Sequence, residues 1–265
     1  MMQSSTQPSQ GVGPQLRDWR QRRRRSQLDL ALDADISARH LSFLETGRSR
    51  PSRDMVLRLA EKLDVPLREQ NELLVAAGFA PVFPERPLDD PRLQTARRAI
   101  DLVLKGHEPY PAIAIDRHWT MVAANAAVAQ LLAGTDPSLH VPPVNVLRLS
   151  LHPAGLAPRI VNIVEWREHL FERLRHQIDL TADPILTELL TELRSYPVST
   201  ALQSVQPSVD YAGVVVPFRL RMGDGELAFF STTTVFGTPI DITLSELAIE
   251  AFFPADEVTA MALRR

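Results

Sequence analysis

The chain has 265 residues, of which 45% are hydrophobic and 23% charged, an ordinary balance for a globular protein of one or two domains. It contains no cysteine, which excludes disulfide frameworks, thiolate catalysis and cysteine-based zinc sites. The sequence has neither a run of about 18 apolar residues nor the apolar stretch of a secretory signal, so we expect a cytoplasmic protein that makes no use of a membrane.

The net charge of −3 conceals an asymmetry along the chain. Residues 1–60 carry 11 arginines against six acidic side chains, a net charge of +5. The remaining residues carry 18 basic and 26 acidic side chains, a net charge of −8. A basic N-terminal part followed by an acidic remainder is expected when one domain binds nucleic-acid phosphates and the other does not.

The N-terminal part of the chain predicts five short helices. Residues 1–12 are small and polar, and we expect them to form a disordered leader. Residues 13–79 then show apolar side chains at helical spacing. The expected N-caps are Ser26, Ser37 and Ser52, a further helix follows Pro66, and the expected helix ends are Gly47 and Gly78. Short helices with tight connections predict a compact all-α domain.

The rest of the chain predicts a linker and a second domain of mixed periodicity. Residues 80–92 contain four prolines and favour a stiff linker, and residues 93–265 are assigned to the second domain. We expect two strands between 110 and 122, helices at 93–104, 125–132 and 158–196, and strands at 214–222, 226–236 and 240–253. This order favours an α+β domain with one five-stranded antiparallel sheet and its helices on one side.

The stretch from Ser26 to Ser52 reads SQLDLALDADISARHLSFLETGRSRPS. It resembles the XRE family of helix-turn-helix proteins, whose fold is that of the lambda and 434 repressors. The resemblance covers residues 14–78 and includes the Ser-Gln helix start and the Ser-x-x-x-Leu-Ser-x-x-Glu-x-Gly pattern. It implies that the second helix of the motif lies in the major groove of double-stranded DNA.

The expected DNA contacts follow from that placement. Arg39 is suited to guanine and Phe43 to a thymine methyl group, although Phe43 could instead belong to the core. Helix starts and the loop after the motif are expected to hold phosphates. The run Arg22–Arg25 could contact phosphate or be a solvated helix end, and Glu45 is expected to tie the helix to a neighbouring turn. The full set of expected DNA contacts is Gln27, Ser37, Ala38, Arg39, His40, Ser42, Phe43, Arg48, Ser49, Arg50 and Arg53.

The second domain resembles the MmyB-like ligand-binding domain of bacterial regulators. The residues that carry the resemblance are YPAIAID at 110–116, Trp119, FSTTTVFGTP at 230–239 and EAFFPAD at 250–256. The resemblance implies a PAS-like fold that senses a small molecule, and an apolar pocket would suit a fatty-acid-like ligand. Most candidate lining residues would be apolar core in any such fold. They are Ile113, Ile115, Trp119, Leu131, Ile163, Trp166, Leu170, Phe218, Phe230 and Phe236.

The sequence offers no catalytic, metal-binding or cofactor-binding motif, so we expect no enzyme and no cofactor. Two hypotheses remain. The first is a ligand-responsive regulator that binds a palindromic operator as a homodimer. The second is a constitutive DNA-binding repressor whose C-terminal domain only dimerises or binds a protein partner. A cavity of several hundred Å³ would favour the first, and a core filled by side chains the second.

Overall fold

The computed structural model describes residues 11–197, 216–223 and 225–264. Its contacts divide the chain into two compact units, one formed mainly by residues up to Glu85 and the other mainly by residues from Arg86 onward. Of the expected leader, residues 1–10 lie outside the described residues, and Val12 already belongs to the first helix. None of the helices in the described ranges is long and apolar enough to span a membrane.

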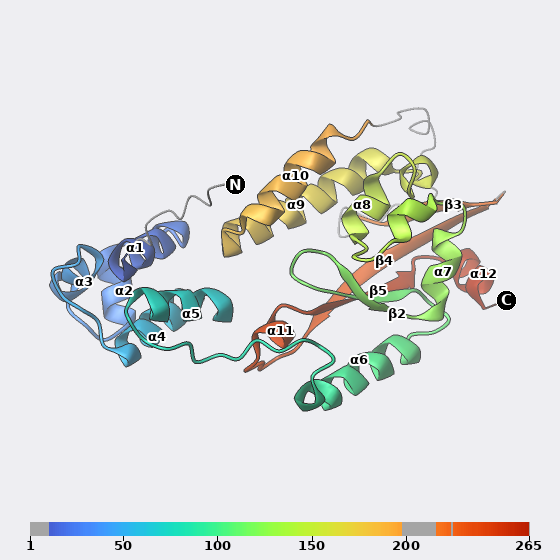
Figure 1. The fold of residues 1–265 in the computed structure, drawn as a ribbon. Helices are drawn as coiled ribbons and strands as arrows, with labels where there is room; N and C mark the ends of the chain where they lie inside the picture. Colours follow the sequence, from blue (N-terminus) through green and yellow to red (C-terminus); the bar gives the residue numbers. More distant parts are fainter. Residues whose placement is uncertain (1–10, 198–215, 224, 265) are drawn as a thin grey trace, which may run out of the picture. The chain divides into compact units, whose positions relative to one another are not determined.

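The first unit contains the five predicted helices (Figure 1). They are α1 (Val12–Arg22), α2 (Gln27–Asp33), α3 (Ala38–Glu45), α4 (Arg53–Lys62) and α5 (Leu67–Ala76). The three predicted serine caps are confirmed. Ser26 accepts the backbone N–H of Asp29 in a reciprocal capping box, while Ser37 and Ser52 each accept the N–H three residues further on. Each cap satisfies a backbone donor that a helix start leaves unpaired.

The core of this unit brings the helices into close contact. Its fully buried members come from all five helices and include Leu16, Leu30, Leu41, Leu44, Leu59, Leu63, Leu73 and Leu74. At Gly13, in the first turn of α1, an added Cβ would lie 2.4 Å from the carbonyl oxygen of Leu44. Only glycine therefore allows the start of α1 to pack this closely against the end of α3.

The second unit is built on one antiparallel sheet of five strands. The strands are β1 (Ala112–Ile115), β2 (Met121–Ala124), β3 (Phe218–Met222), β4 (Gly225–Val235) and β5 (Ala248–Pro254). They lie in the order β2-β1-β5-β4-β3, so the last strand pairs with the first and occupies the centre. The predicted fold class is thus confirmed, a five-helix domain followed by an α+β domain with a five-stranded sheet. The first two residues of the strand expected at 214–222 lie outside the described residues.

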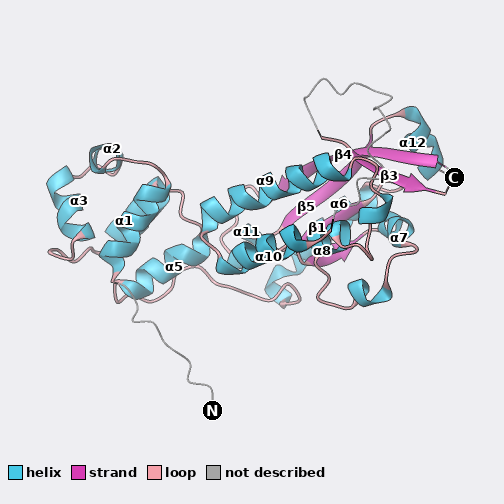
Figure 2. Ribbon diagram, turned by 90° about the horizontal axis from the view of Figure 1, so that it is seen from above, coloured by secondary structure: helices cyan, strands magenta, loops and turns pink. Residues whose placement is uncertain are grey.

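Helices cover both faces of this sheet, which corrects the expectation that they lie on one side (Figures 1 and 2). The helices are α6 (Gln94–Gly106), α7 (Ala126–Leu132), α8 (Val146–Leu151), α9 (Ile163–Thr181), α10 (Pro184–Ser195), α11 (Ile242–Ser245) and α12 (Glu257–Leu263), with 3-10 turns at Pro91–Leu93, Pro137–His140 and Ala157–Arg159. Helices α8, α9 and α10 lie over one face. Helix α6 packs against the other, where Ile100 and Leu104 meet the small side chains of Ala112 and Ala114.

Two predicted elements differ from the structure for local reasons. The helical region 158–196 is interrupted because Ala182 adopts a positive φ of 60° and Asp183 caps a new helix that begins with Pro184. Proline is well suited to the first turn of a helix but not to its interior. The strand expected from Ile240 begins only at Ala248, after the short helix α11.

Alternation along the strands separates two packing layers. On β1, Ile113 and Ile115 join the large core beneath α9, whereas Ala112 and Ala114 face α6. On β4, Phe229 is fully buried in the large core. Its neighbour Phe230 stacks on Phe253 with ring centres 5.5 Å apart. Period-two alternation therefore decides which side chains can reach the space under α9.

Candidate nucleic-acid interface and ligand pocket

The helix-turn-helix motif consists of α2, a tight turn and α3. Asp35 adopts a positive φ of 54° in the turn, and the N–H of Ile36 donates to the carbonyl oxygen of Ala31 at 2.9 Å. This left-handed residue reverses the chain so that α3 starts at once at its Ser37 cap. Leu41 and Leu44 anchor the inner face of α3 in the core, which directs the other face outward.

The outward face of α3 presents an arginine–phenylalanine–arginine stack. Arg39 is exposed, and its guanidinium lies 5.3 Å from the centre of the Phe43 ring. Arg48, beyond the helix end, lies 5.8 Å from the same ring centre. Phe43 is half-buried and does not belong to the hydrophobic core of the unit. Cation–π contacts hold both guanidinium groups over one aromatic surface.

Three more of the expected contact residues follow this stack in the chain. Arg50 and Arg53 are exposed, while Ser49 is half-buried. Gly47 ends α3 with a φ of 72°, and the N–H groups of Arg48 and Ser49 donate back to the carbonyl oxygen of Phe43. In the described part of the chain, none of the arginines at 39, 48, 50 and 53 forms an ion pair. Helix α3 and the residues just after it therefore carry four arginines without an ion-pair partner among the described residues.

Some expected contacts also have partners inside the unit. Ala38 packs partly against the core, and the Ser37 hydroxyl accepts the His40 N–H at 3.1 Å. His40 and Ser42 are half-buried on α3. The Gln27 side-chain amide donates to Glu45 at 2.7 Å, so the structure uses this amide to orient α3 against α2.

Glu45 is the centre of a buried ion pair. The Arg20 guanidinium donates to both of its carboxylate oxygens, at 2.6 and 2.9 Å, and only 1% of the Glu45 side chain is exposed. The hydrogen bond from Arg20 to Glu45 raises the pKa of the guanidinium. Glu45 thus links α1, α2 and α3 rather than a single neighbouring turn.

The arginine run after α1 is partly structural. Arg23 donates to the carbonyl oxygens of Leu63 and Asp64, each at 2.8 Å, and Arg25 donates to that of Lys62 at 2.9 Å. These are the unpaired carbonyl groups at the end of α4, where a cation also favours the helix dipole. The sequence left open a phosphate contact or a solvated helix end for this run, and the structure gives Arg23 and Arg25 a third role, capping the end of α4.

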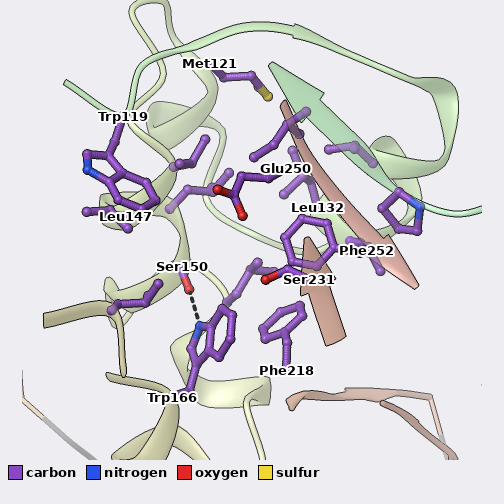
Figure 3. Close-up of a pocket in the computed structure, with 18 of the residues that line it drawn as sticks. Trp119, Met121, Leu132, Leu147, Ser150, Trp166, Phe218, Ser231, Glu250 and Phe252 are labelled. Carbon is purple, nitrogen blue, oxygen red and sulfur yellow. Dashed lines mark hydrogen bonds between the residues drawn. The ribbon is translucent and has the colours of Figure 1, made fainter. Parts of the chain in front are cut away.

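A pocket opens between the sheet and helices α7, α8 and α9 of the second unit (Figure 3). Its volume is about 90 Å³, counted as the space that the centre of a water molecule can reach. One water needs about 10–15 Å³ on this scale, so the core is not filled by side chains. The lining residues are Pro111, Ile113, Trp119, Met121, Val128, Leu131, Leu132, Val146, Leu147, Leu149, Ser150, Leu156, Trp166, Leu170, Arg173, Phe218, Ser231, Glu250 and Phe252.

Six of the ten expected ligand-binding residues line this pocket, and four do not. The six are Ile113, Trp119, Leu131, Trp166, Leu170 and Phe218. Ile115 and Ile163 are buried in the surrounding core. Phe230 and Phe236 contact the layer on the opposite face of the sheet, because the odd-numbered residues of β4 face the pocket there.

The polar residues of the pocket were not expected from the sequence. Arg173 follows Trp166 and Leu170 on α9 at seven and three residues' spacing, which places all three on one helix face. Glu250 is the only acidic residue in the otherwise apolar strand Ala248–Pro254. An acidic residue at a pocket-facing position of a central strand is a signal that could have been used.

These two residues form an ion pair at the edge of the pocket, in which Glu250 is buried and Arg173 is partly exposed. The Arg173 guanidinium donates to the two oxygens of Glu250 at 2.5 and 3.2 Å, and the Thr233 hydroxyl donates to Glu250 at 2.8 Å. Only 3% of the Glu250 side chain is exposed. Burial, together with the charge of Arg173, lowers the pKa of the neighbouring His169, which keeps that ring neutral near pH 7.

Trp119 forms a wall of the pocket from the turn between β1 and β2. It adopts a positive φ of 64°, a conformation that is costly for a bulky side chain. The indole N–H donates to Gln177 of α9 at 2.8 Å, and the Arg173 guanidinium lies 4.8 Å from the ring centre. These contacts with α9 hold the strained turn against the pocket. Trp166, which also lines the pocket, donates its indole N–H to Ser150 (Figure 3).

Comparison with protein families identifies the two domains. Residues 96–265 match the model of the MmyB-like transcription regulator ligand binding domain, and residues 16–70 match a helix-turn-helix model. The first match alone covers more than half of the chain. The chain is an MmyB-like transcription regulator. Its pocket therefore lies in a ligand-binding domain, and its α2–α3 motif lies in a DNA-binding domain. Transcription regulators of this kind are not enzymes. A comparison with curated protein sequences finds no match for this MmyB-like regulator.

Proposed function

We propose that this regulator reads its operator with the outward face of α3 and holds the DNA backbone with the loop that follows. The observation that carries the proposal is the set of four arginines on α3 and just after it, which have no ion pairs in the described part of the chain and two of which lie over the Phe43 ring. Arg39 and Phe43 serve as base-contacting residues, and Arg48, Arg50 and Arg53 serve as phosphate contacts. A single motif has a small interface, so we further propose a homodimer on a palindromic operator.

Two substitutions separate these roles. Arg39→Ala is expected to cost about 1–3 kcal/mol of binding, concentrated at one base position. Arg48→Ala is expected to weaken binding to all sequences alike and to reduce the salt slope by about one. The operator is first selected from a random DNA pool, and affinities are then measured by fluorescence anisotropy at several salt concentrations.

A matched control for lost charge is Arg97→Ala, which removes an exposed arginine of α6 in the other unit. It should leave affinity and salt slope close to the unchanged protein. Equal losses from Arg39→Ala and Arg48→Ala on every sequence would contradict the assigned division between base and phosphate contacts.

We further propose that the pocket binds an apolar or amphiphilic ligand of the fatty-acid type, a slim alkyl chain with a small polar end. The pocket is lined mainly by aliphatic and aromatic side chains, and its 90 Å³ is less than the several hundred Å³ of typical ligand sites. A narrow chain suits such a space better than a bulky ring system.

Native mass spectrometry of the purified protein tests this proposal. We expect one small molecule per chain that is lost on denaturation. Val128→Phe, which fills the pocket from α7, should abolish this species. Val122→Phe, on an exposed position of β2 outside the pocket, should retain it. Protein without any bound molecule, whose DNA binding ignores added amphiphiles, would favour the constitutive repressor with a dimerisation domain.

A further inference from the structure

Helix α6 of the second unit is apolar on two sides. Its inner face packs Ile100 and Leu104 against the sheet (Figure 1). Its outer face exposes two large apolar side chains next to each other, Leu102 at 72% and Val103 at 45% of their surface. A surface helix normally carries polar and charged residues on the side away from the core. The outer side of α6 therefore has the composition of a helix face that another element covers.

Two small residues extend this outer face by one turn in each direction. Ala99 and Gly106 are exposed, and their spacing of three and four residues from Leu102 places them on the same side of the helix. A Cβ added to Gly106 would meet no atom within 4 Å. Small side chains at a helix surface allow a second helix to approach closely. We call Ala99, Leu102, Val103 and Gly106 the outer stripe of α6.

Charged side chains follow one flank of the outer stripe. Arg98, Asp101 and Lys105 are exposed and lie at three- and four-residue spacing, and the exposed Glu108 follows just beyond the helix end. None of these four side chains forms an ion pair with any residue that the structure describes. The charges along this flank therefore alternate in sign and are available to a partner.

We infer that the outer stripe of α6 binds α6 of a second copy of this chain, with the two helices antiparallel and a two-fold axis at Val103. The inference rests on the homodimer proposed above and names its contact surface. In a symmetric dimer the same patch meets itself, so the patch must be complementary to its own copy. Leu102 and Val103 of both copies meet at the centre of this contact, where burial of apolar surface stabilises association.

The charged flank of α6 is complementary to its own copy in this arrangement. A two-fold axis at Val103 places each residue opposite the one equally far on the other side of Val103 in the partner, and it brings the same flank of both helices together. Asp101 and Lys105 each lie two residues from Val103, and Arg98 and Glu108 each lie five residues from it. Every carboxylate on this flank therefore faces a basic side chain of the other copy.

The substitution Leu102→Lys in the full chain tests the contact. We expect the dimer dissociation constant, measured by sedimentation velocity, to rise at least about tenfold, because the added cation lies beside Lys105 of both copies. Leu102 is mostly exposed, so the fold should tolerate the change. The matched control is Met261→Lys, which makes the same change at an exposed position of α12 and should leave the dimer unchanged. Weakening by Met261→Lys alone would overturn the inference.

An exchange of charges tests the antiparallel arrangement. Asp101→Lys and Lys105→Asp should each weaken the dimer about tenfold, because by symmetry each places like charges beside one another twice. Combining the two substitutions should return the dissociation constant to within about threefold of the unchanged protein, because the opposed charges are again of unlike sign. A double variant that dimerises no better than the single variants would overturn the inference.

The oligomeric state of the unchanged protein separates the inference from the homodimer on which it rests. If the protein is a monomer both free and on its operator, the proposed homodimer fails and the inference fails with it. If it is a dimer that withstands Leu102→Lys and both single charge reversals, the homodimer stands and only the inference about α6 fails.

Discussion

Replacing Glu45 with alanine is expected to lower the local stability of helices α1, α2 and α3 by about 3 kcal/mol. The substitution leaves the guanidinium of Arg20, whose side chain is only 11% exposed, without its counter-charge, and it also removes the acceptor of the Gln27 amide. Loss of one partner of a buried ion pair costs more than the pair contributes, because a charge remains buried and unpaired.

Hydrogen–deuterium exchange of peptides from these helices measures the local opening free energy. Glu61→Ala, which removes an exposed carboxylate of α4, provides the matched control. Replacing Arg20 and Glu45 together by methionine should restore much of the loss, because two apolar side chains of similar size can replace a buried pair. A loss for Glu45→Ala no larger than that for Glu61→Ala would show that the ion pair does not hold α3 in place.

The second large effect is expected from Phe229→Ala in the large core of the second unit. Phe229 is fully buried, and its ring contacts those of Phe218 and Phe252 at centroid distances of 6.2 and 6.4 Å. Truncation to alanine should cost about 3–5 kcal/mol, since it removes a large side chain and leaves a cavity.

The substitution of the next residue, Phe230→Ala, is the control for Phe229→Ala. Phe230 is half-buried on the opposite face of the same strand, where it stacks on Phe253. Its truncation should cost about 1–2 kcal/mol. Urea unfolding followed by near-ultraviolet circular dichroism measures both variants. A larger loss for Phe230→Ala than for Phe229→Ala would reverse the faces assigned to β4.

Local chemistry explains which parts of the fold could be predicted from the sequence. A serine cap acts on a backbone group three residues away, so Ser26, Ser37 and Ser52 marked helix starts without reference to the rest of the chain. The strands were visible as runs of β-branched and aromatic residues between turn signals. The break before Pro184 also had a local signal, an aspartate followed by proline, although the helical periodicity on both sides obscured it.

Features that depend on distant partners could not be predicted in this way. The pair Phe229–Phe230 fits either phase of a strand, and only pairing with β5 decides which ring enters the large core. Arg23 and Arg25 were ambiguous because their acceptors lie at the end of α4, about forty residues away. The ion pair of Arg173 with Glu250 joins residues separated by 77 positions, so its electrostatic role in the pocket appears only after folding.

The position of the tryptophans makes the pocket optically accessible. The chain has three of them; Trp119 and Trp166 form walls of the pocket, whereas Trp19 lies in the core of the first unit. Both pocket indoles donate a hydrogen bond, one to Gln177 and one to Ser150, and the first also faces a guanidinium. Their emission is therefore set by groups that a bound molecule would touch or displace. With Trp19 replaced by phenylalanine, this regulator would report occupancy of its pocket through its own fluorescence, without any attached dye.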